Sequence, residues 1–416
     1  MMRKDFDNEE YLLFEMLSLV FSEAFGSEFE HKAEMIIIKR NKNSDTNWQK
    51  FIDIADKHGV LSLLYDVLSG GEVLPASLRQ RLKVISNSII LQNYHLLFLS
   101  RTVIELLEKA DIPAVILKGC TTSEFYPVPE LRKSGDVDVL LLNKDDIKKT
   151  EEVLTKAGFK KNEEQMVHHH IAFVTKEGIE IEMHVMFAEP FDNNKTNRCL
   201  EKIYNDCKEH VNKKDVMGVM LPVLDDGYHA FYLLLHMLQH FLRSGFGLKL
   251  FCDWVAYFRH DIDEKQCKIF MQLVNECGLL MFAQTVTAAC VGYLGLSASK
   301  VSFIFEEEIT IEKAKQLSRN MMFEVVEAEE FGHSSIDRMV IVRGSGINGY
   351  IREFHHQMHL NYPKCGKIFL FWPVLWIATL IRFIYNNRKI RKTTSVDILK
   401  KAKKRSRLLK EIELFK

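Results

Sequence analysis

Residues 134–142, Ser-Gly-Asp-Val-Asp-Val-Leu-Leu-Leu, place two carboxylates two positions apart in an otherwise apolar run. Side chains two apart in a β-strand point to one face, so Asp136 and Asp138 would share a face opposite the valines. Two residues of strand advance about 6.6 Å, which lets both carboxylates reach one metal site. Burying them without a partner is unfavourable, and cations such as Mg²⁺ prefer oxygen ligands. The alternative is a solvated strand end with two surface acids, and the motif alone does not decide.

The flanking sequence favours the metal site. Residues 112–119 are a short apolar run closed by Lys118 and Gly119, which predicts a strand, a turn and a helix over about 121–125. Residues 179–185 alternate strictly, which places Glu180, Glu182 and His184 on one polar face. Residues 176–178 predict a turn, and residues 167–174 predict the partner strand of a hairpin. The sequence thus predicts a strand, a glycine turn, a helix, the Asp-x-Asp strand and a hairpin that carries an acid.

This order resembles the nucleotidyltransferase superfamily related to DNA polymerase beta. The signature there is a glycine turn, then hydrophobic-Asp-hydrophobic-Asp, then a third carboxylate on a later strand. The closer likeness is to its bacterial branch of uncharacterised nucleotidyltransferases, and it covers most of the chain. The matching stretches are residues 48–55, 58–60, 64–65, 117–119, 126–127 with Arg132, 135–140, 158–159, 182–184, 236–241, 247–249 and 253–254. One departure is Cys120, which follows Gly119 where the superfamily turn often has Gly or Ser.

The resemblance implies an α+β fold, with a small mixed-sheet nucleotidyltransferase core flanked by N-terminal and C-terminal helical regions. It also implies a Mg²⁺-dependent transfer of a nucleoside monophosphate from a nucleoside triphosphate to a hydroxyl acceptor, with release of pyrophosphate. Two Mg²⁺ ions, or Mn²⁺ in their place, would stabilise the attacking and leaving oxygens. The ligands would be Asp136 and Asp138 for both ions and Glu182 for the ion at the acceptor hydroxyl. Glu180, on the same strand face as Glu182, remains an alternative.

The expected nucleotide contacts lie around the same strands. Lys118 and the backbone N–H groups after Gly119 would hold the triphosphate at a helix start. Arg132 would neutralise a phosphate, and His184 would orient the nucleotide or the acceptor. The acceptor stays open between a small molecule, a peptide, a lipid head group, a protein and RNA. A polymerase or tRNA-specific enzyme is disfavoured because the chain is not basic overall and shows no nucleic-acid module.

A second hypothesis is a catalytically inactive scaffold, or a nucleotide-binding interaction protein, that keeps the same fold. Grouped, mutually repelling carboxylates argue against it, because a scaffold has no use for them.

The chain divides into four predicted parts. These are an N-terminal helical region (1–100), the α/β core (101–221), a helical domain (222–362) and an apolar, then basic tail (363–416). In the helical domain, His229, His236 and His240 fall on one helix face, which indicates either a zinc site or a stripe that faces the catalytic site. For His168 and His170, at the start of the predicted hairpin, a metal site, a substrate contact and a surface strand end all stay open.

The tail carries most of the charge asymmetry. Residues 382–416 hold thirteen Lys or Arg against three acids, a net charge of +10 in a chain whose total is zero. Residues 368–381 are uncharged and mostly apolar, but they are fewer than the roughly twenty that span a bilayer. Either this segment contacts a membrane surface peripherally, or it packs on the folded domain. The eight scattered cysteines and the lack of a convincing signal peptide predict free thiols in the cytoplasm, with the inner face of the membrane as a second location.

Overall fold

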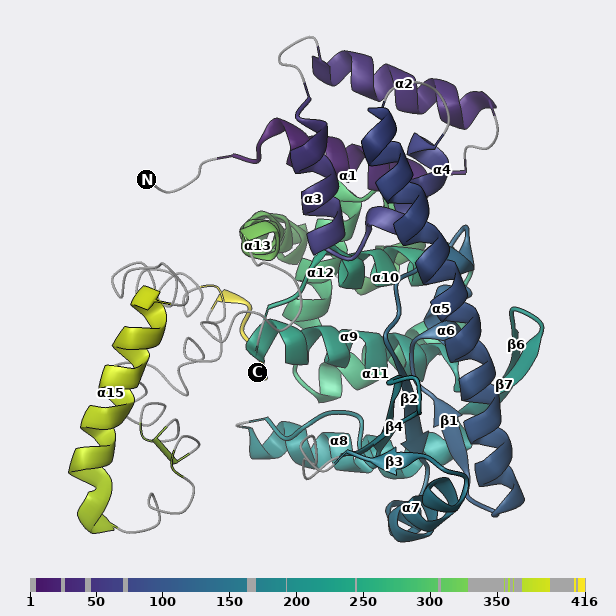
Figure 1. Ribbon diagram of the computed structural model, residues 1–416, viewed down its shortest axis with the longest axis vertical. Coiled ribbons are helices and arrows are strands. Elements are labelled where there is room, and N and C mark those ends of the chain that lie inside the picture. Colours follow the sequence, from purple (N-terminus) through teal and green to yellow (C-terminus); the bar gives the residue numbers. More distant parts are fainter. Residues whose placement is uncertain are drawn as a thin grey trace.

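The computed structural model describes residues 5–23, 27–41, 46–69, 74–162, 170–191, 193–243, 245–305 and 308–327, and near the C-terminus 355, 358–359, 362, 369–389, 408 and 411–415. The centre of the fold is one seven-stranded sheet in the order β3-β4-β5-β2-β1-β7-β6 (Figure 1). Its strands are β1 (Ala114–Ile116), β2 (Asp136–Leu141), β3 (Lys160–Lys161), β4 (His170–Val174), β5 (Glu180–His184), β6 (Val211–Val216) and β7 (Val219–Leu224). The pairs β2–β5 and β1–β7 are parallel and the others antiparallel, which confirms the predicted mixed sheet.

Helices precede, interrupt and follow the sheet, so the predicted α+β fold is confirmed. The N-terminal helices are α1 (Asn8–Val20), α2 (Ser27–Asn41), α3 (Trp48–Lys57), α4 (Tyr65–Leu68) and α5 (Ala76–Lys109). Between strands lie α6 (Cys120–Ser123), α7 (Ile147–Lys156) and α8 (Asn194–Asp206). After the sheet come α9 (Asp226–Arg243), α10 (Leu248–Arg259), α11 (Glu264–Glu276), α12 (Leu280–Tyr293), α13 (Glu308–Glu327) and α15 (Trp372–Lys389).

The central strands contribute to a different hydrophobic core on each face of the sheet. In β2, Val137, Val139 and Leu141 pack with side chains of α5 and α7. Leu140, which alternates with them, belongs to the other core, which contains the helices before and after the sheet. Asp136 and Asp138 share the face of Leu140 because side chains alternate along a strand. The acids therefore point towards the side of the sheet that the later helices cover.

Two predicted domain boundaries fall inside secondary-structure elements. Helix α5 is a single element of 34 residues that runs through the expected boundary at residue 100. Strand β7 likewise runs through the expected boundary at residue 221. The N-terminal helices and the helices after the sheet also share one hydrophobic core. Both regions therefore support the sheet together.

The C-terminal tail consists of two parts with different surroundings. At its end, Leu408 and Ile412 are buried in the core, and the Phe415 N–H donates to the Gly278 carbonyl oxygen at 2.8 Å. This end of the tail therefore packs on the folded domain, whereas the two alternatives drawn from the sequence concern residues 368–381. Helix α15, in contrast, carries several exposed apolar side chains. None of the helices within the described ranges is long and apolar enough to cross a membrane.

Candidate active site

The parallel pairing of β2 with β5 builds the acidic face of the sheet. In its register Asp136 lies beside Glu180, Asp138 beside Glu182, and Leu140 beside His184. Adjacent strands are about 4.8 Å apart, and paired residues point to the same face. The alternation that the sequence shows on each strand therefore becomes a single patch of four carboxylates and one imidazole.

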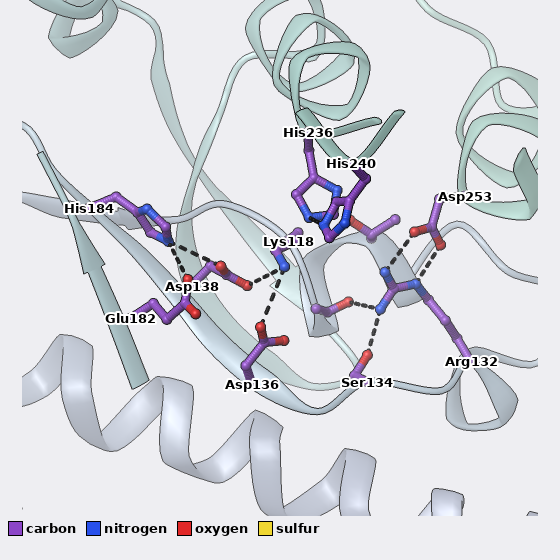
Figure 2. Close-up of polar contacts among 12 residues, drawn as sticks. Lys118, Arg132, Ser134, Asp136, Asp138, Glu182, His184, His236, His240 and Asp253 are labelled. Carbon is purple, nitrogen blue, oxygen red and sulfur yellow. Dashed lines mark hydrogen bonds and ion pairs between the residues drawn. The ribbon is translucent and has the colours of Figure 1, made fainter. Parts of the chain in front are cut away.

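Asp138, Glu182 and His184 form the closest group in this patch. The His184 Nε2 atom lies 3.1 Å from Asp138 Oδ1 and 3.2 Å from Glu182 Oε2 (Figure 2). One ligand atom from each of the three residues lies within 4.8 Å of the others. Asp138 is almost fully buried, whereas the Glu182 side chain keeps 23% of its surface exposed. The group is thus buried at Asp138 and accessible to solvent at Glu182.

Lys118 joins Asp136 to this group. The residue lies two positions after the end of β1, and its Nζ atom is 3.1 Å from Asp138 Oδ2 and 3.5 Å from Asp136 Oδ2. The shorter contact is an ion pair without hydrogen-bond geometry. Asp138 Oδ2 is therefore buried without accepting a hydrogen bond. Both predicted aspartates therefore face one lysine, and one buried carboxylate oxygen keeps a lone pair for another ligand.

The pKa values in the site follow from burial and from these ion pairs. Burial alone would lower the pKa of His184, but its hydrogen bonds to Asp138 and Glu182 raise that pKa to about 9. Burial would also lower the pKa of Lys118, yet the facing acids hold it well above its ordinary value. The pKa values of Asp138 and Glu182 are lowered despite their burial, because Lys118 and His184 favour the charged forms. Two cations thus balance part of the acidic charge.

Burial, and then the neighbouring acids, raise the pKa of Glu180. Glu180 thus differs from Glu182, whose pKa is lowered, despite burial, by its hydrogen bond to His184 and by Lys118.

The donor set of this group fits a divalent cation. Carboxylate oxygens suit Mg²⁺ and Mn²⁺, and an imidazole nitrogen is acceptable to Mn²⁺ more than to Mg²⁺. The buried Asp138 Oδ2 atom is the observation that favours a further ligand, since it forms an ion pair with Lys118 but accepts no hydrogen bond. Asp138, Glu182 and His184 are the residues that would hold the ion, which would displace the proton that His184 Nε2 shares with the two carboxylates, because only a neutral imidazole binds a metal. The sequence predicts the two carboxylates but assigns His184 to the nucleotide or acceptor.

Gly119 forms the turn between β1 and α6. Its φ of 78° is strained for residues with a side chain, which explains the need for glycine here. Its carbonyl oxygen accepts hydrogen bonds from the Ser123 N–H at 3.0 Å and from Arg132 Nη1 at 3.2 Å. Helix α6 contains four residues, all buried. The turn therefore sets the path of the backbone beside Asp136.

Arg132 has a partner other than the phosphate expected from the sequence. Its Nε and Nη2 atoms lie 2.6 and 2.8 Å from the two carboxylate oxygens of Asp253 on α10, and its Nη1 atom also donates to Ser134 Oγ. Arg132 is 2% exposed and Asp253 is 4% exposed. Tyr126 donates a further hydrogen bond to Asp253 at 2.6 Å. The guanidinium thus ties α10 to the Gly119 turn and to the start of β2.

The histidine stripe on α9 divides between two environments. His236 and His240 lie near Lys118, with their Nε2 atoms 3.1 Å apart (Figure 2). His229 is buried elsewhere, stacked on Tyr257 with ring centroids 5.0 Å apart. Among the described residues no third metal-ligating side chain joins the His236–His240 pair. The part of the stripe nearest Lys118 thus faces the acidic group, as one of the two alternatives predicts.

His168 lies outside the described residues, as does the first part of the predicted strand 167–174. His170 begins β4, and its backbone lies opposite His184 in the antiparallel register with β5.

Sequence analysis missed Tyr232 and Lys249 as neighbours of the acids. Tyr232 on α9 is buried, and its pKa is raised well above its ordinary value by burial and by Asp138. Lys249 lies in the first turn of α10, and burial together with Arg132 lowers its pKa to about 8. Helical spacing alone cannot place these helices over the sheet, so the only earlier signal was Lys249 in a stretch that resembles the family.

Comparison with known proteins identifies the family of the chain. The model of the uncharacterised nucleotidyltransferase family matches residues 44–295, and the chain belongs to that family. None of the curated proteins compared with the chain matches it. Among solved structures, a similar chain is that of an antigenic nucleotidyltransferase-like protein from Paracoccidioides brasiliensis, at 14% identity and a TM-score of 0.31. The match covers 50% of this chain and 96% of that one.

Proposed function

We propose that this protein is a divalent-metal-dependent nucleotidyltransferase. It would move a nucleoside monophosphate from a nucleoside triphosphate to a hydroxyl acceptor. In this reaction the acceptor oxygen forms a bond to the α-phosphorus, the bond to the β-phosphate oxygen breaks, and pyrophosphate leaves. The observation that carries the proposal is the convergence of Asp138, Glu182 and His184 beside Asp136 and Lys118.

A divalent cation held by Asp138, Glu182 and His184 would supply positive charge at the phosphoryl oxygens and lower the pKa of the acceptor hydroxyl. The chain itself contributes the negative face that attracts the ion. It also contributes Lys118, which faces both Asp136 and Asp138 and offsets part of the repulsion between their carboxylates. Asp136, whose side chain is 33% exposed, remains open to a second ion or to solvent.

The triphosphate would lie on the side of Lys118 that faces α9 and α10. Lys118, His236 and His240 are close together there (Figure 2), and Lys249 contributes a further cation from the start of α10. Phosphate groups favour clustered cationic and N–H donors. The Arg132–Asp253 pair would act indirectly, because it holds the Gly119 turn and α10 in place.

Glu182 is suited to the acceptor side. Its partial exposure leaves room for a hydroxyl group, and its hydrogen bond with His184 fixes the carboxylate. Removing this carboxylate is therefore expected to stop transfer more completely than nucleotide binding.

Radiolabel transfer tests the proposal. Purified protein would be incubated with Mg²⁺ or Mn²⁺, cell extract and each α-labelled nucleoside triphosphate in turn, and any labelled acceptor would be identified. We expect label in an acceptor with the wild type, and none with Asp138→Asn. Glu152→Gln, an exposed acid on α7, is the matched control and should transfer label normally.

The same experiment separates the enzyme from an inactive nucleotide-binding scaffold. A scaffold would bind a nucleoside triphosphate in calorimetry but release no pyrophosphate and label no acceptor with any nucleotide. Transfer that persists in Asp138→Asn would contradict the assignment of the site.

A further inference from the structure

Helix α15 turns an apolar strip towards solvent. Leu370, in the 3-10 turn Phe369–Phe371 directly before the helix, and Val374, Ile377 and Ile381 of α15 recur every three or four residues, and they are 82%, 66%, 61% and 62% exposed. A surface helix normally presents polar residues on its solvent side. Helix α15 therefore differs from an ordinary surface helix, because it presents apolar residues to solvent.

The opposite side of α15 makes polar and aromatic contacts. Trp376 donates from Nε1 to His355 Nδ1 at 3.2 Å, and the Trp372 ring lies edge-on to the same imidazole, with centroids 4.4 Å apart. Thr379 is buried. These contacts fix which side of the helix faces outwards, so the exposed strip is a property of the packed helix.

The position of α15 leaves the strip accessible. The helix lies along one flank of the molecule, away from the sheet (Figure 1). Helix α13 before it and Leu408 after it both belong to the main core. Helix α15 thus lies between two anchored segments and not at a free end.

The charge of the adjacent sequence indicates what the strip contacts. The apolar segment ends at Arg382, and from there to the C-terminus the sequence has thirteen Lys or Arg against three acids. Basic residues beside an apolar helical face are typical of helices that lie in the interface of a membrane with anionic lipids. This excess of positive charge is complementary to an anionic surface.

We propose that the apolar strip of α15 binds the surface of an anionic lipid bilayer. The helix would lie in the plane of the membrane, with Leu370, Val374, Ile377 and Ile381 at the boundary between headgroups and acyl chains. The basic residues that follow would contact the headgroups. At 18 residues, α15 is about 27 Å long, enough to lie along the interface. This proposal is independent of the nucleotidyltransferase activity.

Vesicle flotation tests the proposal with the full chain. Vesicles of phosphatidylcholine with phosphatidylglycerol at about three to one would be compared with pure phosphatidylcholine. Salt would be varied from about 0.1 M to about 1 M, over which the Debye length falls from about 10 Å to about 3 Å. We expect binding to the anionic vesicles at low salt, severalfold weaker binding at high salt, and little binding to neutral vesicles.

The double variant Val374→Gln/Ile377→Gln should weaken vesicle binding about tenfold or more, because two apolar side chains no longer enter the membrane. Both side chains are exposed, so the variant should fold normally and keep its nucleotide affinity. Met220→Gln, which alters an exposed apolar residue on β7, is the matched control and should bind as the wild type does.

Three results would overturn the proposal. The first is no binding of the wild type to anionic vesicles at low salt, and the second is equal binding by the double variant. The third is a concentration-dependent self-association that the double variant abolishes, with no vesicle binding, which would make the strip a contact between copies of the chain.

Discussion

The Arg132–Asp253 ion pair should be a main source of stability around the site. Asp253→Asn keeps the shape of the side chain but removes its charge, and this leaves the guanidinium buried without a counter-charge. Removing one partner of a buried pair destabilises a protein by about 3–5 kcal/mol. The upper part of that range is expected because Asp253 accepts three hydrogen bonds, at 2.6, 2.8 and 2.6 Å.

Urea unfolding is a suitable assay, because the indole of Trp254 is buried next to Asp253 in α10 and reports on this region. With a slope of about 3 kcal/mol per molar urea, the expected loss moves the midpoint down by roughly 1–2 M. Glu105→Gln is the matched control, since the Arg101–Glu105 pair is exposed on α5 and should contribute about 1 kcal/mol or less. Equal midpoint shifts for the two variants would refute this reasoning.

Three further predictions concern the site and the fold. Glu182→Gln should abolish transfer and largely spare nucleotide binding in calorimetry, and a greater loss of transfer in Glu180→Gln would identify the other acid as the catalytic one. Gly119→Ala should lower stability by about 1–3 kcal/mol in urea unfolding, because its positive φ strains any side chain, whereas Gly135→Ala, with nothing within 4 Å of the new methyl group, should change stability much less. Burial lowers the pKa of His229 to about 3, so as the pH falls below about 6.5 the unfolded chain takes up a proton before the folded chain does. The free energy of unfolding should then fall by roughly 1 kcal/mol per pH unit. An unchanged pH dependence of stability in His229→Gln would contradict this assignment.

Strand alternation made most of the acidic face predictable. It places Asp136 with Asp138, and Glu182 with His184, because a strand with one buried face leaves only one choice of side. The direct parallel pairing of β2 with β5 was not predictable, because no local pattern specifies which distant strands meet. Because of that pairing, His184 contacts Asp138 on β2 in addition to Glu182 on its own strand.

Long-range contacts explain the remaining differences. Arg132 has the sequence context of a phosphate ligand, but its partner, Asp253, lies 121 residues away. The hairpin of β6 and β7 turns at Met217 and Gly218, both with positive φ, and Met-Gly is a weak turn signal. The absence of glycine and proline from the sequence of α5 indicates that the helix continues through residue 100, where a domain boundary was predicted.

Direct observation of a bound ion tests the central claim, that Asp138, Glu182 and His184 form a metal site. Mn²⁺ would be titrated into the purified protein, and the free ion would be measured by its electron paramagnetic resonance signal. We predict that the wild type binds Mn²⁺, that Mg²⁺ competes for the site, and that Asp138→Asn weakens binding about tenfold or more, while Glu152→Gln binds normally. Equal Mn²⁺ affinity in the wild type and in Asp138→Asn would contradict the account.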